Sequence, residues 1–447
     1  VGSEMCIRDS MEGFIDNQGN FGADGIVGPH HEKEGSFYTI KQLWSPVQIM
    51  NTSVDKQFDG KFSVENRYDY LNLNTCRFLW KQVKFPTATD ASNTTAQVLK
   101  QGETQGSDVA AHSAGVLNIK TTILPDADAL FLTAIDRYGH ELWRWTFPVN
   151  KLNQANEVLS PLSNKVTSTE TENELTVKAK NHTFIFSKKD GQLKGVSVNN
   201  RKISFANGPR FIGARRADRS LDQFYNHDDE KAKEKDRTYS EFPDAAVFTK
   251  LDVKEDGGNL IVTANYKLGN LDKAQWTINP SGEAVLDYTY NFSGVVDLMG
   301  ICFDYPEDQV ISKRWLGAGP YRVWQNRIHG TQYDVWENDY NDPIPGETFT
   351  YPEFKGYFGS VSWMNIRTKE GTISLTNETP DAYIGVYQPR DGRDRLLYTL
   401  PESGISVLNV IPPVRNKVNS TDLCGPSSQP KWVNGPQSGR IIFRFME

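Results

Sequence analysis

Cysteine is scarce in this sequence, and its spacing offers neither a metal site nor a disulfide framework. The four cysteines are Cys6, Cys76, Cys302 and Cys424, and no two of them form a C-x-x-C pair. A structural zinc site and a disulfide-stapled scaffold are therefore not expected. We expect buried free thiols, because an unpaired cysteine behaves as a small apolar side chain.

Long apolar runs and a basic surface pattern are also absent. No stretch of eighteen apolar residues occurs, so the sequence predicts no membrane-spanning helix. The 49 basic and 56 acidic residues give a net charge of −7, and no basic stripe alternates with aromatic residues. Neither a membrane nor a nucleic acid is therefore an expected partner.

Turn-forming and aromatic residues are plentiful. The chain has 35 glycines, 22 prolines and 11% aromatic residues, a mixture typical of turn-rich β structure. With 447 residues it is too long for one ordinary hydrophobic core. We therefore expect two or three domains.

The first 45 residues differ from the rest. Residues 1–10, VGSEMCIRDS, resemble a translated sequencing adaptor and are set apart from the fold. After a Gly-rich and Asn-rich loop, Phe37, Ile40 and Trp44 form one apolar stripe, which predicts a helix from about Glu32 to Trp44. One amphipathic helix cannot bury its own stripe, so we expect its packing partner to lie outside this chain.

From residue 46 onward, apolar and polar residues alternate with a period of two. Residues 46–150 contain short strand-like segments with the spacing of an immunoglobulin-like β-sandwich. Residues 151–172 are polar and read as a linker, and residues 173–447 predict a larger β-sandwich with almost no helix. Within it, Asp190-Gly191 predicts the turn of a β-hairpin. The expected fold class is all-β.

Three motifs carry a resemblance to a known family. Residues 22–49, GADGIVGPHHEKEGSFYTIKQLWSPVQI, resemble the last loop and helix of the catalytic barrel in glycoside hydrolase family 2, of the bacterial β-galactosidase type. Residues 315–330, WLGAGPYRVWQNRIHG, are similar to a W-L-G-x-G-P motif of that family. The hairpin FSKKDGQLKGV resembles the entry to its final sandwich, and residues 341–358 also match some members.

The resemblance implies both an architecture and an activity. Residues 11–45 would be the remnant of a (β/α)8 barrel, residues 46–150 the second immunoglobulin-like domain, and residues 173–447 a galactose-mutarotase-like supersandwich. The family cleaves β-galactosides or related β-glycosides by a retaining double displacement between two glutamates. Both glutamates would lie upstream of this chain, so the resemblance implies a carboxy-terminal fragment that is inactive alone.

The resemblance also implies site residues in the barrel loop. Phe21 would give its carbonyl and Asp24 its carboxylate to a sodium or magnesium ion in the full-length enzyme, although Asp24 stands where the family has Asn. Phe21, Asp24 and His30 would lie near the substrate, because barrel enzymes bind substrate on such loops. Alternatively, Asp24 turns the loop through its backbone, and His30 packs at the entry to the helix.

Other candidates are weaker. The acidic run Asp228, Asp229 and Glu230 is not expected to be catalytic, because adjacent residues do not converge on one bond. An arginine-rich segment would face either an anionic sugar or its own salt-bridge partners; its charged residues are Arg215, Arg216, Asp218 and Arg219. Val407 stands where the family places a tryptophan against the sugar. The sequence therefore supports specificity for galactose less strongly than it supports the resemblance to the family.

Three classes of function stay open on the sequence. They are a part of a glycoside hydrolase, whose full-length form could also act on an acidic or other non-galactose glycoside; a non-catalytic carbohydrate-binding sandwich; and a mutarotase-like or lyase-like sandwich. The expected partner is a carbohydrate, either a β-galactoside or a plant or algal oligosaccharide. The full-length protein could form a homo-oligomer, and the compartment is open between cytoplasm and periplasm.

Overall fold

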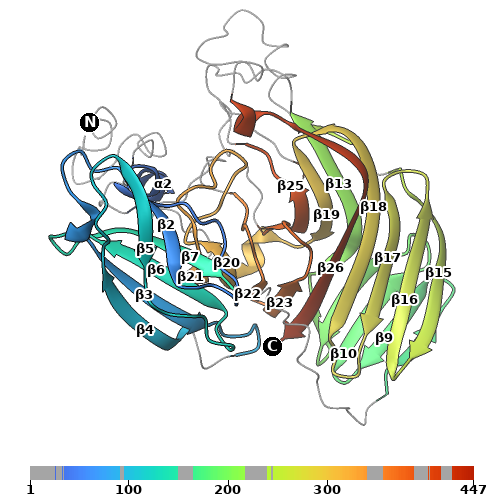
Figure 1. The fold of residues 1–447 in the computed structure, drawn as a ribbon. Helices are drawn as coiled ribbons and strands as arrows, with labels where there is room; N and C mark the ends of the chain where they lie inside the picture. The colour runs from blue at the N-terminus through green and yellow to red at the C-terminus, as the bar shows by residue number, and fades with distance from the viewer. Residues whose placement is uncertain are drawn as a thin grey trace, which may run out of the picture.

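The computed structural model describes residues 26, 33, 35–90, 95–149, 165–216, 239–242, 245–339, 356–386, 401, 403–413 and 425–447. Apart from the nine-residue helix α2 (Gly35–Leu43) and single turns of 3-10 helix, the regular structure in these residues is β-strand (Figure 1). The predicted all-β architecture of packed sandwiches is thereby confirmed. None of the described helices has the length and apolarity needed to cross a bilayer.

The first sandwich packs a three-stranded sheet on a four-stranded sheet. The strand orders are β1-β2-β5 and β4-β3-β6-β7, and all pairings are antiparallel. Strand β2 shows why it folds this way, because Phe62 and Val64 alternate with exposed residues and point into the core. The strands are β1 (Val47–Ile49), β2 (Lys61–Asn66), β3 (Arg77–Lys84), β4 (Gln97–Gln105), β5 (Ser113–Asn118), β6 (Ala129–Ile135) and β7 (Glu141–Pro148), with a 3-10 turn at η2 (Leu73–Thr75).

The second and larger sandwich begins with a ten-stranded sheet in the described part of the chain. Its order is β24-β25-β19-β13-β11-β10-β9-β8, with β12 and β14 paired at the side. These strands are β8 (Thr167–Glu170), β9 (Glu174–Ala179), β10 (His182–Ser187), β11 (Leu193–Val198), β12 (Arg201–Ile203), β13 (Ala206–Arg216), β14 (Tyr239–Glu241), β19 (Leu298–Asp304), β24 (Tyr383–Gly385) and β25 (Ile405–Val410).

Facing it is a nine-stranded sheet of order β15-β16-β17-β18-β26-β23-β22-β20-β21. Its strands are β15 (Val247–Asp256), β16 (Asn259–Lys267), β17 (Leu271–Ile278), β18 (Ala284–Val296), β20 (Val310–Gly319), β21 (Gln332–Asp339), β22 (Trp363–Thr368), β23 (Gly371–Asn377) and β26 (Lys431–Met446). Single 3-10 turns lie at η4 (Glu307–Gln309) and η7 (Pro426–Ser428). The long strand β26 runs through the middle of this sheet (Figure 1).

The two sheets enclose one core in which aromatic rings gather at the centre. Phe205 stacks on Phe303 with ring centroids 4.6 Å apart, and Phe443 lies 5.1 Å from Phe205. Trp276 contacts Phe303 and Phe443 from strand β17. All four of these side chains are buried, and each buried large side chain contributes about 1.5–3 kcal/mol.

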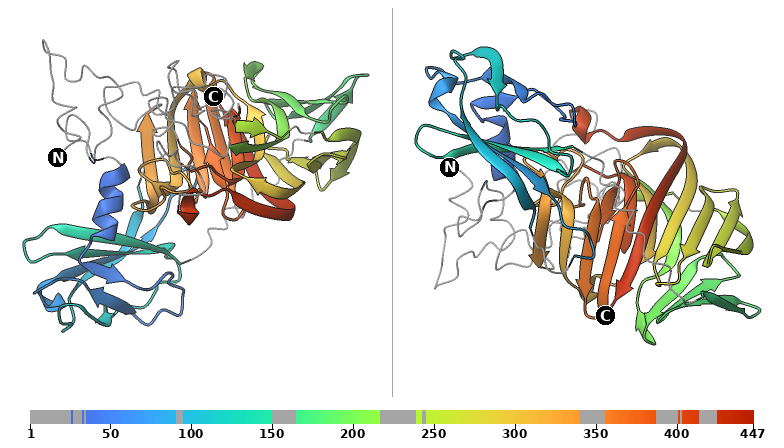
Figure 2. Two further views of the ribbon diagram at one scale, coloured as in Figure 1. Left: turned by 90° about the horizontal axis from the view of Figure 1, so that it is seen from above. Right: turned by 60° about the horizontal axis from the view of Figure 1, so that its bottom comes forward.

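The first sandwich lies against the β20–β22 side of the nine-stranded sheet, as the views in Figures 1 and 2 agree. Phe85 and Phe131 of the first sandwich form one buried cluster with Leu316 and Trp363 of the second. The Trp363 indole Nε1 donates to the carbonyl of Pro86 at 3.0 Å. The contact between the sandwiches is therefore apolar at its centre and hydrogen-bonded.

Helix α2 forms where the sequence predicts one, and it makes contacts with the large sandwich of this chain. Tyr38 stacks on Tyr321 of the large sandwich with centroids 5.9 Å apart, and the Gln42 side chain accepts a hydrogen bond from the Gly330 amide. A Cβ atom on Gly330 would lie 2.4 Å from the Thr39 backbone, so only glycine permits this approach. The helix thus has packing partners within this chain, although none of its residues is buried.

Two further details refine the expected organisation. Strand β8 (Thr167–Glu170) pairs with β9 inside the segment predicted as linker, so the large sheet begins before residue 173. The hairpin predicted at Asp190-Gly191 is confirmed, because β10 and β11 pair antiparallel on either side of that turn. Residues 11–25, which include most of the predicted barrel loop, lie outside the described residues.

Candidate functional site

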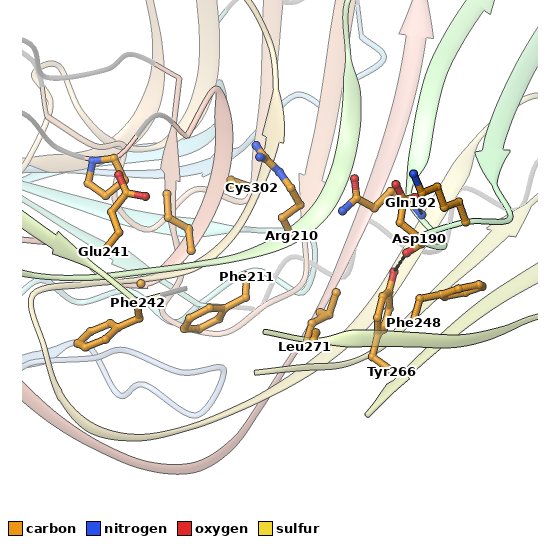
Figure 3. A pocket seen from close by; sticks show the side chains of 15 residues that line it. Asp190, Gln192, Arg210, Phe211, Glu241, Phe242, Phe248, Tyr266, Leu271 and Cys302 are labelled. Atoms are coloured by element: carbon orange, nitrogen blue, oxygen red, sulfur yellow. Dashed lines mark hydrogen bonds between the residues drawn. The ribbon is translucent and has the colours of Figure 1, made fainter. Parts of the chain in front are cut away.

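A pocket of about 430 Å³ opens between the two sheets of the large sandwich. The ten-stranded sheet supplies the β10–β11 turn and strands β13, β14 and β19, and the nine-stranded sheet supplies β15, β16 and β17. In Figure 3, Arg210, Gln192 and Asp190 lie on one side of strand β13, and the aromatic side chains lie on the other. This volume falls in the range of about 300–1,000 Å³ that small-molecule sites occupy.

One wall of the pocket is the β10–β11 turn, which is held in place by the opposite sheet. The Tyr266 hydroxyl of β16 donates a hydrogen bond to the Asp190 carbonyl at 3.0 Å. Gly191 has φ +74°, and a Cβ there would lie 2.7 Å from the Phe248 ring of β15. The positive φ and the close approach both require glycine, so the turn is packed tightly on the second sheet.

A polar network joins this turn to two neighbouring strands. Lys194 Nζ lies 2.8 Å from the Asp190 carboxylate and 3.4 Å from Asn207 Oδ1. Asn207 Nδ2 and Arg210 Nη2 donate to the two oxygens of Asp304, at 2.6 and 2.5 Å. The Arg210 Nε atom is buried and has no hydrogen-bond partner among the described residues. The described residues thus leave one guanidinium donor of Arg210 unsatisfied.

The network also sets the charge of Asp190. Burial acts to raise the pKa of this carboxyl, but the hydrogen bonds from Lys194, the Gln192 amide and Ser187 outweigh it, so the pKa is lowered. Asp190 is therefore ionised over the neutral range, and it is unsuited to act as a general acid.

The aromatic lining is only partly covered. Phe242 and Phe248 are half-buried, and Phe248 meets the Tyr266 ring edge-to-face at 5.9 Å. Phe211 is more deeply packed, against Tyr290 at 5.4 Å. Glu241 and Asp190 stand at opposite ends of this aromatic stretch in Figure 3. The pocket therefore combines apolar walls with polar groups at both ends, an arrangement that suits a ligand with apolar faces and a hydroxylated rim.

Cleavage of a glycosidic bond would need a second kind of carboxyl, one kept protonated by its surroundings. Among the described carboxyl groups, Asp128 has a raised pKa, caused by burial. Asp128 lies in the first sandwich. Its carboxylate accepts a hydrogen bond from the Phe85 amide at 2.8 Å, just after the end of strand β3. The described pocket residues thus offer apolar surface and hydrogen-bonding groups to a ligand.

Most of the residues singled out from the sequence are not placed by the structure. Phe21, Asp24 and His30 lie outside the described residues, and so do the charged residues of the 217–238 segment, namely Asp218, Arg219, Asp228, Asp229 and Glu230. Within the described ranges, no group of three or more His, Cys, Asp or Glu side chains could hold a metal ion. The predicted sodium or magnesium site stays a prediction.

Two of the singled-out positions are described with their side chains. Arg215 of β13 lies 3.7 Å from the buried carboxylate of Asp297, so it has a protein partner. Val407 of β25 is fully buried in the core between the sheets, so its side chain points away from any sugar at the surface. Strand β13 also carries Arg216, of whose side chain nothing is described.

With this geometry established, comparison with known proteins identifies the large sandwich. The sequence profile of the beta galactosidase small chain family matches residues 178–410, more than half of the chain. The chain belongs to the beta galactosidase small chain family. The match covers strands β10 to β25 and includes the whole of the pocket described above. No curated protein matches significantly.

Solved structures are similar to this chain only at low sequence identity. HI1317 has 9% sequence identity and a TM-score of 0.29, with 64% of this chain and 98% of that chain covered. YeaD from Salmonella typhimurium, described as a putative mutarotase, has 10% identity and a TM-score of 0.29, with 65% of this chain and 96% of that chain covered. The protein lmo2446 from Listeria monocytogenes has 9% identity and a TM-score of 0.22, covering 91% and 31%.

Proposed function

We propose that this chain is the carboxy-terminal part of a glycoside hydrolase that cleaves β-galactosides or related β-glycosides. The observation that carries the proposal is the family match over residues 178–410. In this proposal the reaction is a retaining double displacement, and its two catalytic glutamates lie on a preceding segment of a longer protein. A retaining mechanism needs two carboxyl groups about 5 Å apart across the scissile bond.

The experiment compares this chain with the longer protein encoded by the same locus. The longer protein should hydrolyse nitrophenyl β-galactoside, and this chain alone should not, because general acid and nucleophile are missing from it. Turnover by the purified chain that is proportional to its concentration would contradict the proposal that the catalytic glutamates lie outside this chain. A longer protein without activity on any β-glycoside would contradict the hydrolase proposal itself.

A non-catalytic carbohydrate-binding protein is the second candidate. The half-buried aromatic side chains of the pocket and the lowered pKa of Asp190 favour it. Hydrolysis by the longer protein distinguishes the two candidates. A binding protein would bind sugar but would not hydrolyse β-glycosides, even as part of the longer protein. An enzyme for an acidic glycoside has less support, since Arg215 already faces the buried Asp297.

Two further parts of the proposal concern what the longer protein would bind. A sodium or magnesium ion held by Phe21 and Asp24 would position a sugar hydroxyl through hard oxygen ligands. Self-association of the longer protein is also proposed. Magnesium-dependent and sodium-dependent activity, together with the mass in solution, would test these two points.

A further inference from the structure

We propose that the pocket bounded by the β10–β11 turn, β13 and β15–β17 binds one neutral pyranose unit of a saccharide. This inference rests on the proposed function only in taking carbohydrate as the ligand class. It assigns the sugar to particular residues of this chain, and it needs no catalytic residue upstream.

Charge is the first argument. Lys189 and Arg210 bring two positive charges to the lining, and Asp190 and Glu241 bring two negative ones. Arg210 is in addition paired with Asp304, and Asp190 with Lys194. A balanced lining gives an anionic ligand no net attraction, so a neutral ligand with many hydroxyls fits best.

Hydrogen-bonding capacity is the second argument. A sugar hydroxyl both donates and accepts, and it therefore fits best between a carboxylate or amide oxygen and a cationic donor. The pocket offers such groups at both ends, with Arg210 and Gln192 near the turn and Glu241 at the other end. Arg210 lines the pocket from strand β13, and its buried Nε has no partner among the described residues.

Shape and apolar surface are the third argument. The half-buried rings of Phe242 and Phe248 offer apolar surface between the two polar ends, where the C–H face of a pyranose ring can pack. The volume of about 430 Å³ lies toward the small end for ligand pockets, which favours one sugar unit over an extended oligosaccharide. The wall at Asp190 is fixed by the Tyr266 hydrogen bond, so the site needs little ordering on binding.

The test measures binding of methyl β-galactoside, methyl β-glucoside and methyl β-glucuronide to the full chain by saturation-transfer NMR and titration. The neutral glycosides should bind saturably. Glu241→Gln exchanges a charged acceptor for a neutral one and Gln192→Leu removes a hydrogen-bonding group, so each should weaken binding about three- to tenfold. Glu255→Gln on β15, an exposed carboxylate that pairs with Lys165 and does not line the pocket, is the matched control and should bind as the unmodified chain does.

Three results would overturn the inference: no saturable binding, equal affinity of both pocket variants and the control, or preferential binding of the glucuronide. Thermal unfolding midpoints verify that the variants fold. Glu241 is exposed at the end of a short strand, so Glu241→Gln decides the matter even if Gln192→Leu does not fold. Hydrolysis by the longer protein is a separate readout, so failure of the hydrolase proposal would leave these binding results standing.

Discussion

At the scale of single residues, two tryptophans of the large sandwich provide a matched comparison. Trp363 is 0% exposed and donates its indole N–H to Pro86 of the first sandwich, whereas Trp432 is 71% exposed. Trp363→Phe should lower the free energy of unfolding by about 1–3 kcal/mol, because a buried carbonyl loses its donor. Trp432→Phe should change it by less than about 0.5 kcal/mol. Urea denaturation followed by circular dichroism measures both, and equal effects would contradict the interface.

Two aspartates should show opposite pH dependence. Asp190 has a lowered pKa, so its charge stabilises the fold above the unfolded value of about 3.9, and this stabilisation is lost as the pH falls below it. Asp128 has a raised pKa, caused by burial, so its ionisation costs stability as the pH rises above that value. Asp190→Asn should therefore lower the unfolding midpoint at pH 7, whereas Asp128→Asn should raise it.

Both differences from the unmodified chain should shrink as the pH approaches 3. Thermal scans of the three proteins between pH 3 and pH 7 would reveal this. A difference that stays constant with pH, in either variant, would mean that the carboxyl acts through shape and not through its charge.

Few of the pocket residues could be predicted individually. The Asp190-Gly191 turn is visible in the sequence, since this dipeptide is a strong hairpin signal. Its partners are not visible, because Arg210 and Tyr266 approach the turn only through pairing across two sheets. The sequence instead directed attention to Phe21, Asp24 and His30 through the family resemblance, and these lie outside the described residues.

At the scale of elements, the β10–β11 hairpin should depend on its glycine more than other hairpins do. Gly191→Ala places a Cβ at positive φ and within 2.7 Å of the Phe248 ring. Gly258, in the β15–β16 turn, also has positive φ, +90°, but its nearest neighbour would be 4.0 Å away. Gly258→Ala should cost about 1 kcal/mol from the backbone alone, and Gly191→Ala about 1–3 kcal/mol more from overlap.

Chemical denaturation of the two variants measures this difference. The comparison isolates space, because both glycines have left-handed backbone conformations and both close two-strand turns of the same sandwich. Equal losses of stability in Gly191→Ala and Gly258→Ala would show that the β10–β11 turn can move away from β15. The pocket wall that this turn forms would then be flexible.

Element prediction succeeded where burial alternates and failed where it does not. Strand β2 has alternating buried and exposed residues, and it lies within residues 46–150, where the sequence predicts the strands of a sandwich. All four residues of β8 are exposed, so no apolar pattern separates this strand from a polar linker. Helix α2 was found from its stripe, but its contacts with Tyr321 and Gly330 join residues far apart in sequence, which periodicity does not report.

At the scale of the whole molecule, the apolar contact between the sandwiches should hold them together without a covalent link. A specific protease site placed between residues 155 and 160, outside the described ranges, allows this test. After cleavage the two pieces should still elute together, because Phe85, Phe131, Leu316 and Trp363 remain buried in one cluster. Phe85→Ala should release them, since it removes a ring packed 5.6 Å from Tyr333.

Tyr138→Ala is the control, because Tyr138 is an exposed aromatic residue of the same sandwich. Its cleaved product should stay associated. Pieces of the unmodified chain that separate at once would mean that the interface depends on the connection between the sandwiches, and that the cluster contributes little to their association.

The position of β26 has a consequence for how the chain is made. Strand β26 (Lys431–Met446) lies between β18 and β23, and it pairs with both. During synthesis β18 and β23 leave the ribosome before β26. Until β26 emerges, the edge of each strand that pairs with it is unpaired and can pair with other chains. The first sandwich, whose core ends at Phe147, can fold while translation continues. The large sandwich can close only after its last strand has emerged, so a ribosome that stalls anywhere before residue 431 leaves a nascent chain whose larger half is still open.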